Sequence, residues 1–415
     1  MKVLQVNKFY FPFAGSERVM FETMKLLRSH GHEVAPFAIR DERNLDSEYS
    51  DLFPAGLDLK SAEGFSFSRK LAAAFRFVSF RQAYLNVRQV SDSFQPDIAH
   101  LHNIYHHLSP SVAAGLKSKS VPVVMTLHDF KLVCPTYSLY RNGNICEECS
   151  GGRFYSAVRN RCVRGSLVGS LTCAVEGYIH NLTRAYRNNV NLFISPSRLL
   201  KEKFVQMGFP GDRIRVLPNF VQTAPVESRG EESVENKHIL FMGRLHPTKG
   251  ADVLIKAVKM IDDDTLKLVI AGTGEEEKQL RSLAEPLSGD RIVFAGFKTG
   301  DDLKGLIREA RFGVVPSTWY ENCPMVTLEF WGSKKAVVAS DLGGLSEMIS
   351  HNEDGLLVEH GNPEKLAGTI KILLDDPRKA AIMGEKGFEK IKTKFSPESH
   401  YRGLIEIYEE AADLA

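Results

Sequence analysis

The chain has 415 residues, of which 43% are hydrophobic and 25% are charged. This composition is ordinary for a globular protein, so it excludes a collagen, a coiled coil or a disordered chain as the dominant state. Lysine and arginine outnumber aspartate and glutamate by 53 to 51, and so small an excess gives no global field that would favour nucleic acid as a partner. The length predicts two or three domains.

The pattern of the first residues does not predict a secretion signal. An apolar strand pattern follows Met1 directly, and Lys8 interrupts it before a signal-type apolar region can form. The longest apolar stretch without a charge, 165–175, is eleven residues long, whereas a membrane-spanning helix needs about 20. We therefore expect a cytoplasmic protein without a transmembrane segment.

Short apolar runs alternate with longer segments of helical period, a pattern typical of a parallel sheet covered by helices. The polar segment 222–237 interrupts the pattern, and we interpret it as a linker between two α/β domains of similar size. The expected strands are 3–6, 34–39, 98–101, 121–127 and 192–194 before the linker, and 239–242, 266–270, 292–294, 312–315, 336–339 and 356–358 after it. In doubly wound sheets ligands bind beyond the carboxyl ends of the strands, so the loops that follow strands are the expected functional sites.

The loop 243–250 follows an expected strand and precedes an expected helix. Backbone amides at a helix N-terminus favour an anion, and Arg244 and Lys249 add two cations beside them, which suits a diphosphate. A solvated basic loop that ends in a glycine is the alternative.

Two carboxylates, Glu321 and Glu329, follow the expected strand 312–315. Pro324 suits the first turn of a helix, which places Glu321 in the preceding loop and Glu329 inside the helix. Carboxylates accept paired hydrogen bonds from vicinal hydroxyls, so one would hold a sugar and the other a ribose, while the amides of 323–326 face phosphate. The alternative is that Glu321 complements the helix dipole and Glu329 is solvated.

Two residues of the first domain also follow expected strands. Gly15 lies between a strand and a helix, where the absence of a Cβ lets a ligand approach the backbone, although a tight turn explains this glycine equally. His128 ends a very apolar strand, which delivers it to the carboxyl edge of the sheet. A structural histidine is the alternative there.

In their order and context these motifs resemble those of the retaining GT-B glycosyltransferases of the GT4 family, over essentially the whole chain. The resemblance implies two Rossmann-like, doubly wound parallel-sheet domains that face each other across a cleft. An acceptor-binding domain at 1–217, with a cysteine-bearing insertion at about 130–180, would precede a donor-binding domain at 218–398. A C-terminal helix at 399–415 would cross back to the N-terminal domain.

The same resemblance implies roles for the motif residues. Arg244 and Lys249 would bind the donor diphosphate, and Glu321 would hold hydroxyls of the donor sugar. Glu329 would hold the nucleotide ribose, and His128 would line the donor sugar from the N-terminal domain. The implied catalytic residues are His128, Arg244, Lys249 and Glu321, and the implied donor-binding residues are Gly15, Gly243, Arg244, Lys249, Gly296, Phe297, Glu321, Asn322, Cys323, Pro324, Met325, Val326 and Glu329.

The chain departs from the family pattern at two places. Asn322-Cys323-Pro324 stands where many members have Gly-Phe-Gly, and Ala14 replaces a second glycine in the first loop. In the family the nucleobase is held mostly by backbone near a loop like 295–297, so side chains do not distinguish a UDP-, GDP- or ADP-sugar.

The donor side contains no paired-aspartate metal motif. Residues 262–264 are three aspartates, but they precede an expected strand and are typical of a solvated turn. We expect Arg244 and Lys249 to neutralise the departing diphosphate instead, so that catalysis needs no cofactor.

Cys134, Cys146, Cys149 and Cys162 have the spacing C-x11-C-x2-C-x12-C, which is compatible with a structural zinc site. Reduced thiols in a long insertion are the alternative. Similar cysteine-bearing insertions occur in a subset of the polysaccharide glycosyltransferases that the chain resembles, which favours the metal. Cys173 falls in an apolar helical stretch and is not counted among the ligands.

Residues 65–90 interleave five phenylalanines with five basic residues and contain no acidic one. A basic, aromatic amphipathic helix of this kind is typical of a segment on an anionic membrane surface. The alternative is a helix that packs its phenylalanine face on the sheet.

The combined expectation is an enzyme that transfers a sugar from a nucleotide-sugar to a hydroxyl of a glycan or lipid-linked glycan, with retention at the anomeric carbon. The alternatives are a GT-B epimerase or hydrolase that acts on a nucleotide-sugar without an acceptor, and a non-catalytic nucleotide-sugar-binding protein. The presence of His128, Arg244, Lys249, Glu321 and Glu329 argues against the non-catalytic protein.

Overall fold

The computed structural model describes residues 1–12, 14–56, 75–222, 238–287, 289 and 291–415, so almost all of the expected linker lies outside the described residues. Its internal contacts divide the chain into two units. Unit 1 consists of Met1–Ser138, Glu147–Leu217 and Tyr401–Ala415, and unit 2 consists of Leu139–Cys146 and Pro218–His400. Each unit contains one six-stranded sheet.

The sheet of unit 1 has the strand order β2-β1-β3-β4-β7-β8, and all its pairs are parallel. Its central strands are buried on both faces, as parallel sheets require. The strands are β1 Lys2–Val6, β2 Glu33–Phe37, β3 Ile98–Leu101, β4 Val123–Thr126, β7 Leu192–Ser195 and β8 Ile214–Val216. The helices described in this unit are α1 Gly15–Ser29, α3 Arg81–Phe94, α4 Tyr105–Leu108, α5 Ser111–Lys117, α6 Tyr155–Arg159, α7 Leu167–Leu182 and α8 Arg198–Gln206, and most of α16 Pro397–Asp413.

The sheet of unit 2 has the order β11-β10-β9-β12-β13-β14 and is likewise parallel. The strands are β9 His238–Met242, β10 Leu268–Ala271, β11 Ile292–Gly296, β12 Ala310–Val315, β13 Val337–Ser340 and β14 Gly355–Val358. The helices are α9 Ala251–Lys259, α10 Glu277–Ala284, α11 Gly300–Glu309, α12 Met325–Gly332, α13 Gly344–Met348, α14 Pro363–Asp375 and α15 Pro377–Lys394. Two buried clusters form its core, one of them around Trp331.

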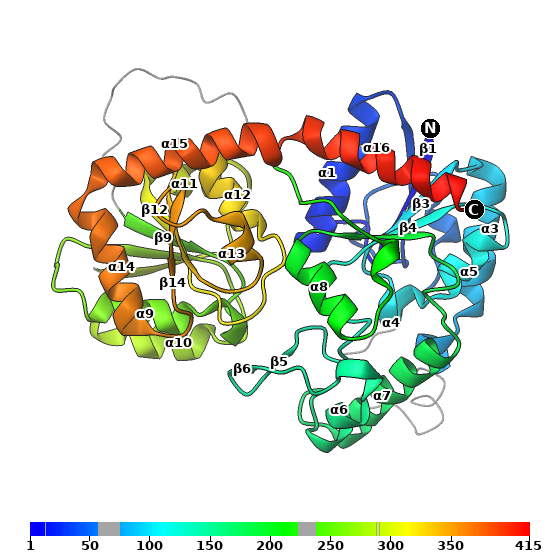
Figure 1. Cartoon of the computed structure of the whole chain (residues 1–415), viewed down its shortest axis with the longest axis horizontal. Coiled ribbons are helices and arrows are strands. Elements are labelled where there is room, and N and C mark those ends of the chain that lie inside the picture. The colour runs from blue at the N-terminus through cyan, green and yellow to red at the C-terminus, as the bar shows by residue number, and fades with distance from the viewer. Residues whose placement is uncertain (13, 57–74, 223–237, 288, 290) are drawn as a thin grey trace. The chain divides into compact units, whose positions relative to one another are not determined.

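The last helix, α16, packs in unit 1. Leu404, Ile407 and Tyr408 are buried together with Val3 and Ile98 of that unit's sheet. Because α16 follows α15 of unit 2, the chain returns at its end to the unit in which it began, and Figure 1 shows α16 in red beside β1 and β3.

In each unit the strand order reverses beside the first strand. The reversal falls between β1 and β3 in unit 1 and between β9 and β12 in unit 2. Ligands of doubly wound sheets bind beyond the carboxyl ends of the strands at this switch point. The loops after β9 and β12 carry Lys249 and Glu321, so the topology brings these two residues to the same point.

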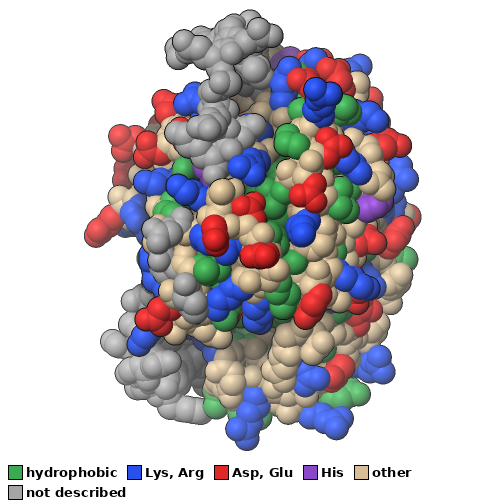
Figure 2. Space-filling view, turned by 90° about the vertical axis from the view of Figure 1, so that its left-hand side faces the viewer, with side chains coloured by type: hydrophobic (Ala, Val, Ile, Leu, Met, Phe, Trp, Pro, Cys, Tyr) green, Lys and Arg blue, Asp and Glu red, His purple; other side chains and the backbone are tan. Residues whose placement is uncertain are grey.

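The expected strands agree with the observed ones to within about two residues, apart from two elements that the sequence analysis missed. One is β8, and the other is the hairpin of β5 Tyr140–Arg141 and β6 Asn144–Ile145, which turns at Asn142 and Gly143. No helix in the described part of the chain is both long enough and apolar enough to cross a membrane. On the face that Figure 2 presents, basic and acidic side chains are interspersed.

Candidate functional site

The loop after β9 is held in a defined shape by its own residues. Pro247–Lys249 form a 3-10 turn, and the His246 ring caps it by accepting a hydrogen bond from the Thr248 amide at 3.2 Å. Gly250 follows with φ +67°, and a Cβ on it would lie 2.0 Å from the carbonyl oxygen of Pro316. Only glycine therefore permits the loops after β9 and β12 to touch here.

Lys249 and Glu321 form an ion pair at this contact. The Lys249 ammonium donates to Glu321 Oε1 at 2.6 Å, and the Ser317 hydroxyl donates to the same oxygen at 2.7 Å. Burial alone would raise the pKa of Glu321, but the Lys249 charge and these hydrogen bonds outweigh it and hold the pKa below its ordinary value. The carboxylate is therefore ionised at neutral pH, and Lys249 keeps part of its side chain exposed.

Arg244 lies on the same loop and is mostly exposed. Its guanidinium is 3.9 Å from Glu275, whose carboxylate is also 3.3 Å from His246. Exposed pairs at such distances contribute little to stability. Arg244 is thus a solvated cation that can turn toward an anion without a large cost.

Glycines that the sequence analysis did not single out fix the neighbouring loops. A Cβ on Gly272 would lie 1.8 Å from the Gly243 carbonyl oxygen, and one on Gly274 would lie 2.1 Å from that of Leu245. A Cβ on Gly344 would lie 1.6 Å from the carbonyl oxygen of Asn322. The signals were the pairs Gly272-Thr-Gly274 after β10 and Gly343-Gly344 after β13, but their partners are visible only in three dimensions.

Helix α12 begins just after Glu321, as expected, with one correction. Pro324 occupies the N-cap and not the first turn, because its ψ of 118° is extended. Glu329 lies half-buried on the second turn of the helix. The amides of Met325 and Val326 have no acceptor in their own helix and so are donors that an anion can use.

Three other implied donor-binding residues, Cys323, Gly296 and Phe297, lie outside the ion pair. The Cys323 thiol is buried, which raises its pKa to about 12, so it offers a ligand its backbone and not its sulfur. Gly296 ends the edge strand β11, two strands away from β9, and the adjacent Phe297 ring is exposed. Lys249, Glu321 and α12 are therefore brought together, whereas Gly296 and Phe297 lie farther along the same sheet edge.

The hairpin of β5 and β6 adds Tyr140, a residue that no sequence motif singled out. The Tyr140 hydroxyl lies 3.0 Å from Thr318 Oγ1, and the Thr318 amide donates to the Thr248 carbonyl at 2.9 Å. Tyr140 thus contacts both loops that carry the ion pair, either directly or through one residue.

In unit 1 Gly15 is the first residue of α1, and a Cβ on it would meet nothing within 4 Å. Its backbone is exposed at the carboxyl edge of the sheet. The neighbouring Glu17 is buried, accepts a hydrogen bond from Asn7 at 3.2 Å and lies 3.6 Å from the Lys8 ammonium. This loop therefore exposes the backbone of Gly15, while the buried charge of Glu17 is balanced by Lys8.

His128 is held by a chain of side chains that the sequence analysis missed. Its Nε2 lies 2.8 Å from His102 Nδ1, and His102 Nε2 lies 2.8 Å from Gln5 Oε1. Because Gln5 Oε1 only accepts, His102 carries its proton on Nε2 and accepts at Nδ1 from His128 Nε2. Burial lowers the pKa of His128 to about 4, so the imidazole is neutral, with no proton on Nδ1.

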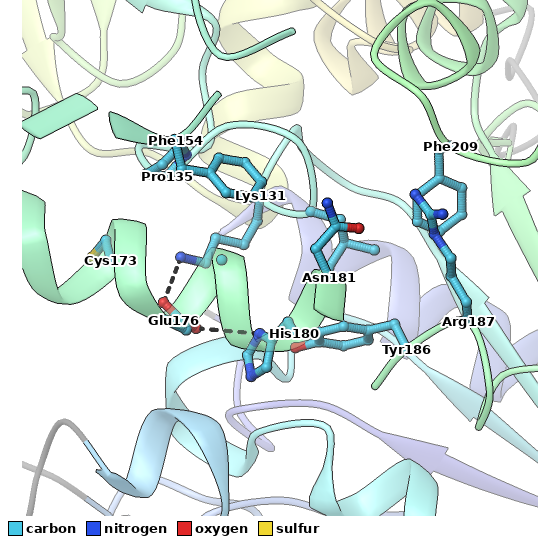
Figure 3. A pocket seen from close by; sticks show the side chains of 12 residues that line it. Lys131, Pro135, Phe154, Cys173, Glu176, His180, Asn181, Tyr186, Arg187 and Phe209 are labelled. Atoms are coloured by element: carbon cyan, nitrogen blue, oxygen red, sulfur yellow. Dashed lines mark hydrogen bonds and ion pairs between the residues drawn. The ribbon is translucent and has the colours of Figure 1, made fainter. Parts of the chain in front are cut away.

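A second buried polar group lies beside α7 (Figure 3). Glu176 Oε2 accepts from the Lys131 ammonium at 2.9 Å and lies 2.7 Å from His106 Nε2. Burial raises the pKa of Glu176, but Lys131 and His106 outweigh it and lower this pKa to about 2. The network anchors the inner face of α7 to Lys131, three residues after His128.

The four cysteines expected to bind zinc do not form a group of potential metal ligands in the described part of the chain. Among the described residues, the group whose potential ligand atoms all lie within 4.8 Å of one another is His106, Cys173 and Glu176. None of the four selected cysteines belongs to it. Cys146 falls in unit 2 and Cys134, Cys149 and Cys162 in unit 1, so the zinc site stays a prediction, which elemental analysis of tag-free protein would test.

The segment 65–90 is described from residue 75 onward. Phe77 and Phe80 are buried, and the Arg76 guanidinium lies 3.6 Å from the centre of the Phe80 ring. These two rings pack into unit 1 and are not available to a lipid surface, whereas Phe75 is exposed. Phe65 and Phe67 lie outside the described residues.

The two doubly wound parallel sheets and the switch-point loops define the GT-B fold of glycosyltransferases. The family model described as Glycosyltransferase Family 4 matches residues 13–224, and the model described as Glycosyl transferases group 1 matches residues 226–390. Because the first match covers more than half of the chain, the chain belongs to glycosyltransferase family 4.

Curated relatives carry related names. An uncharacterized glycosyltransferase, MJ1607 of Methanocaldococcus jannaschii, is 30% identical over 236 residues, which are 53% of this chain and 60% of that protein. The lipopolysaccharide core biosynthesis glycosyltransferase LpsD of Rhizobium meliloti is 29% identical over 229 residues, 54% of this chain and 65% of LpsD. The chain thus spans less than two thirds of the length of either relative.

Solved structures share the fold over nearly the whole chain. Anabaena Alr3699/HepE in complex with UDP-glucose has a TM-score of 0.66 at 20% identity and covers 98% of both chains. Sucrose-phosphate synthase from Thermosynechococcus elongatus has a TM-score of 0.71 at 18% identity and covers 100% of both chains. At such identities the likeness establishes the fold alone.

Proposed function

We propose that the chain transfers a sugar from a nucleotide-sugar to a hydroxyl of a glycan or lipid-linked glycan, with retention at the anomeric carbon and without a catalytic metal. The observation that carries the proposal is the Lys249–Glu321 pair, 2.6 Å apart at the switch point of unit 2. The names of the relatives support the substrate class, since LpsD acts in lipopolysaccharide core biosynthesis and HepE was solved with UDP-glucose.

The charges of the site suit a departing diphosphate. When the bond between the anomeric carbon and the phosphate oxygen breaks, its electron pair stays with the nucleoside diphosphate, so negative charge grows there. Lys249, Arg244 and the first amides of α12 supply positive charge at one loop cluster, which is electrostatic stabilisation by preorganised groups. These groups would take the place of a divalent cation.

The remaining assignments follow the family. Glu321, ionised and fixed by Ser317 and Lys249, would accept hydrogen bonds from sugar hydroxyls, and Glu329 would do so from the ribose. His128, neutral with an unprotonated Nδ1, would accept a hydrogen bond from a sugar hydroxyl. None of these steps needs a residue to change its charge.

A panel of UDP-, GDP- and ADP-sugars tests the proposal. One donor should raise the melting temperature in the presence of EDTA, because a ligand that binds only the folded state stabilises it. With that donor and a glycan acceptor, the anomeric proton of the product, observed by NMR, should show retention. An inverted product, strict dependence on added magnesium, or conversion of the donor without any acceptor would contradict the proposal, and the last result would indicate a hydrolase or epimerase.

A further inference from the structure

Helix α7 carries a stripe of exposed apolar side chains. Leu167, Leu171, Val175, Tyr178 and Leu182 recur at intervals of three or four residues and are all exposed, Leu182 to 86%. Such spacing places them on one face of the helix. Val168 borders this stripe and is 69% exposed, and Tyr155 of α6 is exposed as well.

The opposite face of α7 is the one that packs on unit 1. Ser170, Cys173, Ala174 and Glu176 are buried, and Glu176 is fixed by Lys131 and His106, as Figure 3 shows for Lys131. The helix is therefore anchored through its inner face. Of the stripe, Tyr178 also contributes to the fold, because its hydroxyl accepts a hydrogen bond from the Tyr155 amide at 3.0 Å and its ring contacts Phe154, whereas Leu171, Val175 and Leu182 are exposed. A large exposed apolar patch that does not serve the fold marks an interaction surface.

The charges around the stripe are almost all positive. Residues 149–191 contain six arginines and a single carboxylate, the buried Glu176. Arg159, Arg161 and Arg164 precede the helix and Arg184 follows it, and all four are exposed. The two carboxylates just before this segment are paired, Glu147 with Lys203 and Glu148 with Asn160.

An apolar stripe bordered by arginines matches an anionic lipid surface, where apolar side chains enter the acyl boundary and guanidinium groups meet phosphate headgroups. We propose that the outer face of α7, together with Tyr155 and the flanking arginines, docks the protein on an anionic membrane. The 16-residue helix would lie in the plane of the interface. This surface differs from the 65–90 segment that the sequence analysis considered for a membrane, and the Lys131–Glu176 contact joins it to the loop that carries His128.

Vesicle co-sedimentation tests the docking surface. The wild type should sediment with vesicles of equal parts phosphatidylcholine and phosphatidylglycerol, and binding should weaken with salt and be slight on pure phosphatidylcholine. The stripe variant Leu171→Ser/Val175→Ser/Leu182→Ser should bind the anionic vesicles with an affinity at least roughly tenfold lower than that of the wild type. The charge variant Arg159→Glu/Arg161→Glu/Arg164→Glu should lose its preference for the anionic vesicles.

A matched control removes the same number of exposed apolar side chains from unit 2. The variant Met260→Ser/Ile372→Ser/Ile382→Ser should bind vesicles as the wild type does, because these residues are exposed but lie outside α7. All substituted side chains are exposed, so melting temperatures should be unchanged. The assay uses no nucleotide-sugar, so its outcome is separate from that of the proposed function.

Three results would overturn the inference. They are failure of the wild type to bind anionic vesicles, equal binding by the wild type and the stripe variant, and a wild-type dimer that becomes monomeric in the stripe variant by light scattering. Such a dimer would show that the stripe binds a second copy of the chain and not a membrane.

Discussion

Lys249 and Glu321 are 72 residues apart in the sequence, yet their charged atoms lie 2.6 Å apart. Without a ligand each satisfies the other, which keeps a buried carboxylate ionised. A diphosphate would give the ammonium a more negative partner and leave Glu321 available to hydroxyl groups. In the proposed site the pair would therefore contact both parts of a nucleotide-sugar, its phosphate and its sugar.

The substitution Lys249→Met tests this role. If the ammonium stabilises charge that grows on the diphosphate, kcat should fall by roughly 10² to 10³, the usual effect of removing one such group. The matched control is Lys256→Met on α9, whose ammonium donates to Asp252 at 2.8 Å, and it should leave turnover unchanged. Steady-state kinetics on folded variants would exclude a catalytic role if Lys249→Met stays within about threefold of the wild type.

His102 is a positioning residue in this account, because its Nδ1 accepts a hydrogen bond from the protonated Nε2 of His128. In His102→Leu the proton of the His128 ring should no longer be confined to Nε2. Because the orienting hydrogen bond is lost, kcat should fall by about tenfold. His102→Gln, which can both accept and donate, should restore much of the loss. Long-range nitrogen NMR of the His128 ring reports the tautomer directly, and an unchanged tautomer in His102→Leu would show that His102 has only a structural role.

At the scale of elements, close contacts of backbone with backbone shape the loops of unit 2. Gly344→Ala would place a Cβ 1.6 Å from the Asn322 carbonyl oxygen, so we expect a loss of about 1–3 kcal/mol or more in the free energy of unfolding. The control Gly305→Ala lies within α11, where a Cβ would meet nothing within 4 Å, and should be neutral or stabilising by up to about 1 kcal/mol. Urea unfolding compares the two, and equal stabilities would contradict the close contact.

The sequence predicts the strands well because parallel strands buried on both faces appear as short apolar runs. It missed β8, whose three residues include Arg215, and the β5–β6 hairpin, which has two residues per strand. Periodicity needs more residues than these elements contain. The sequence analysis placed Cys173 in an apolar helical stretch, which is α7, but only the structure shows which of the apolar residues of this helix face outward.

The part of the candidate site that could be predicted consists of motifs whose residues lie close together in the sequence, within one loop. Arg244 and Lys249 share a loop, and Glu321 precedes a helix, as expected. The partners that act across the sheet were not predictable in this way, because His102 and Gln5 reach His128 from β3 and β1. Contacts of this kind depend on strand order, which local pattern does not encode.

At the scale of the whole molecule, buried histidines in both units make stability depend on pH. Burial lowers the pKa values of His128 and His180 in unit 1 and of His400 in unit 2 to about 4. The unfolded chain binds these protons near pH 6.5, so the free energy of unfolding is highest above pH 6.5. It should fall between pH 6.5 and 4 by up to about 3 kcal/mol per histidine.

Calorimetry measures this loss. The melting temperature at pH 5 should be lower than at pH 7 by roughly 5 °C or more. An equal or higher value at pH 5 would mean that these imidazoles are protonated in the folded protein, and the neutral His128 of the account would be wrong.

The central claim is that unit 2 holds a nucleotide-sugar through Lys249 without a metal ion. Isothermal titration of EDTA-treated protein with UDP-glucose, GDP-mannose and ADP-glucose tests this claim most directly. The account predicts that one of these donors binds, that the same donor binds Lys249→Met at least roughly tenfold more weakly, as the loss of a charge-assisted contact implies, and that Lys256→Met binds as the wild type does. Binding that appears only with added magnesium, or that is equal in Lys249→Met and wild type, would contradict it.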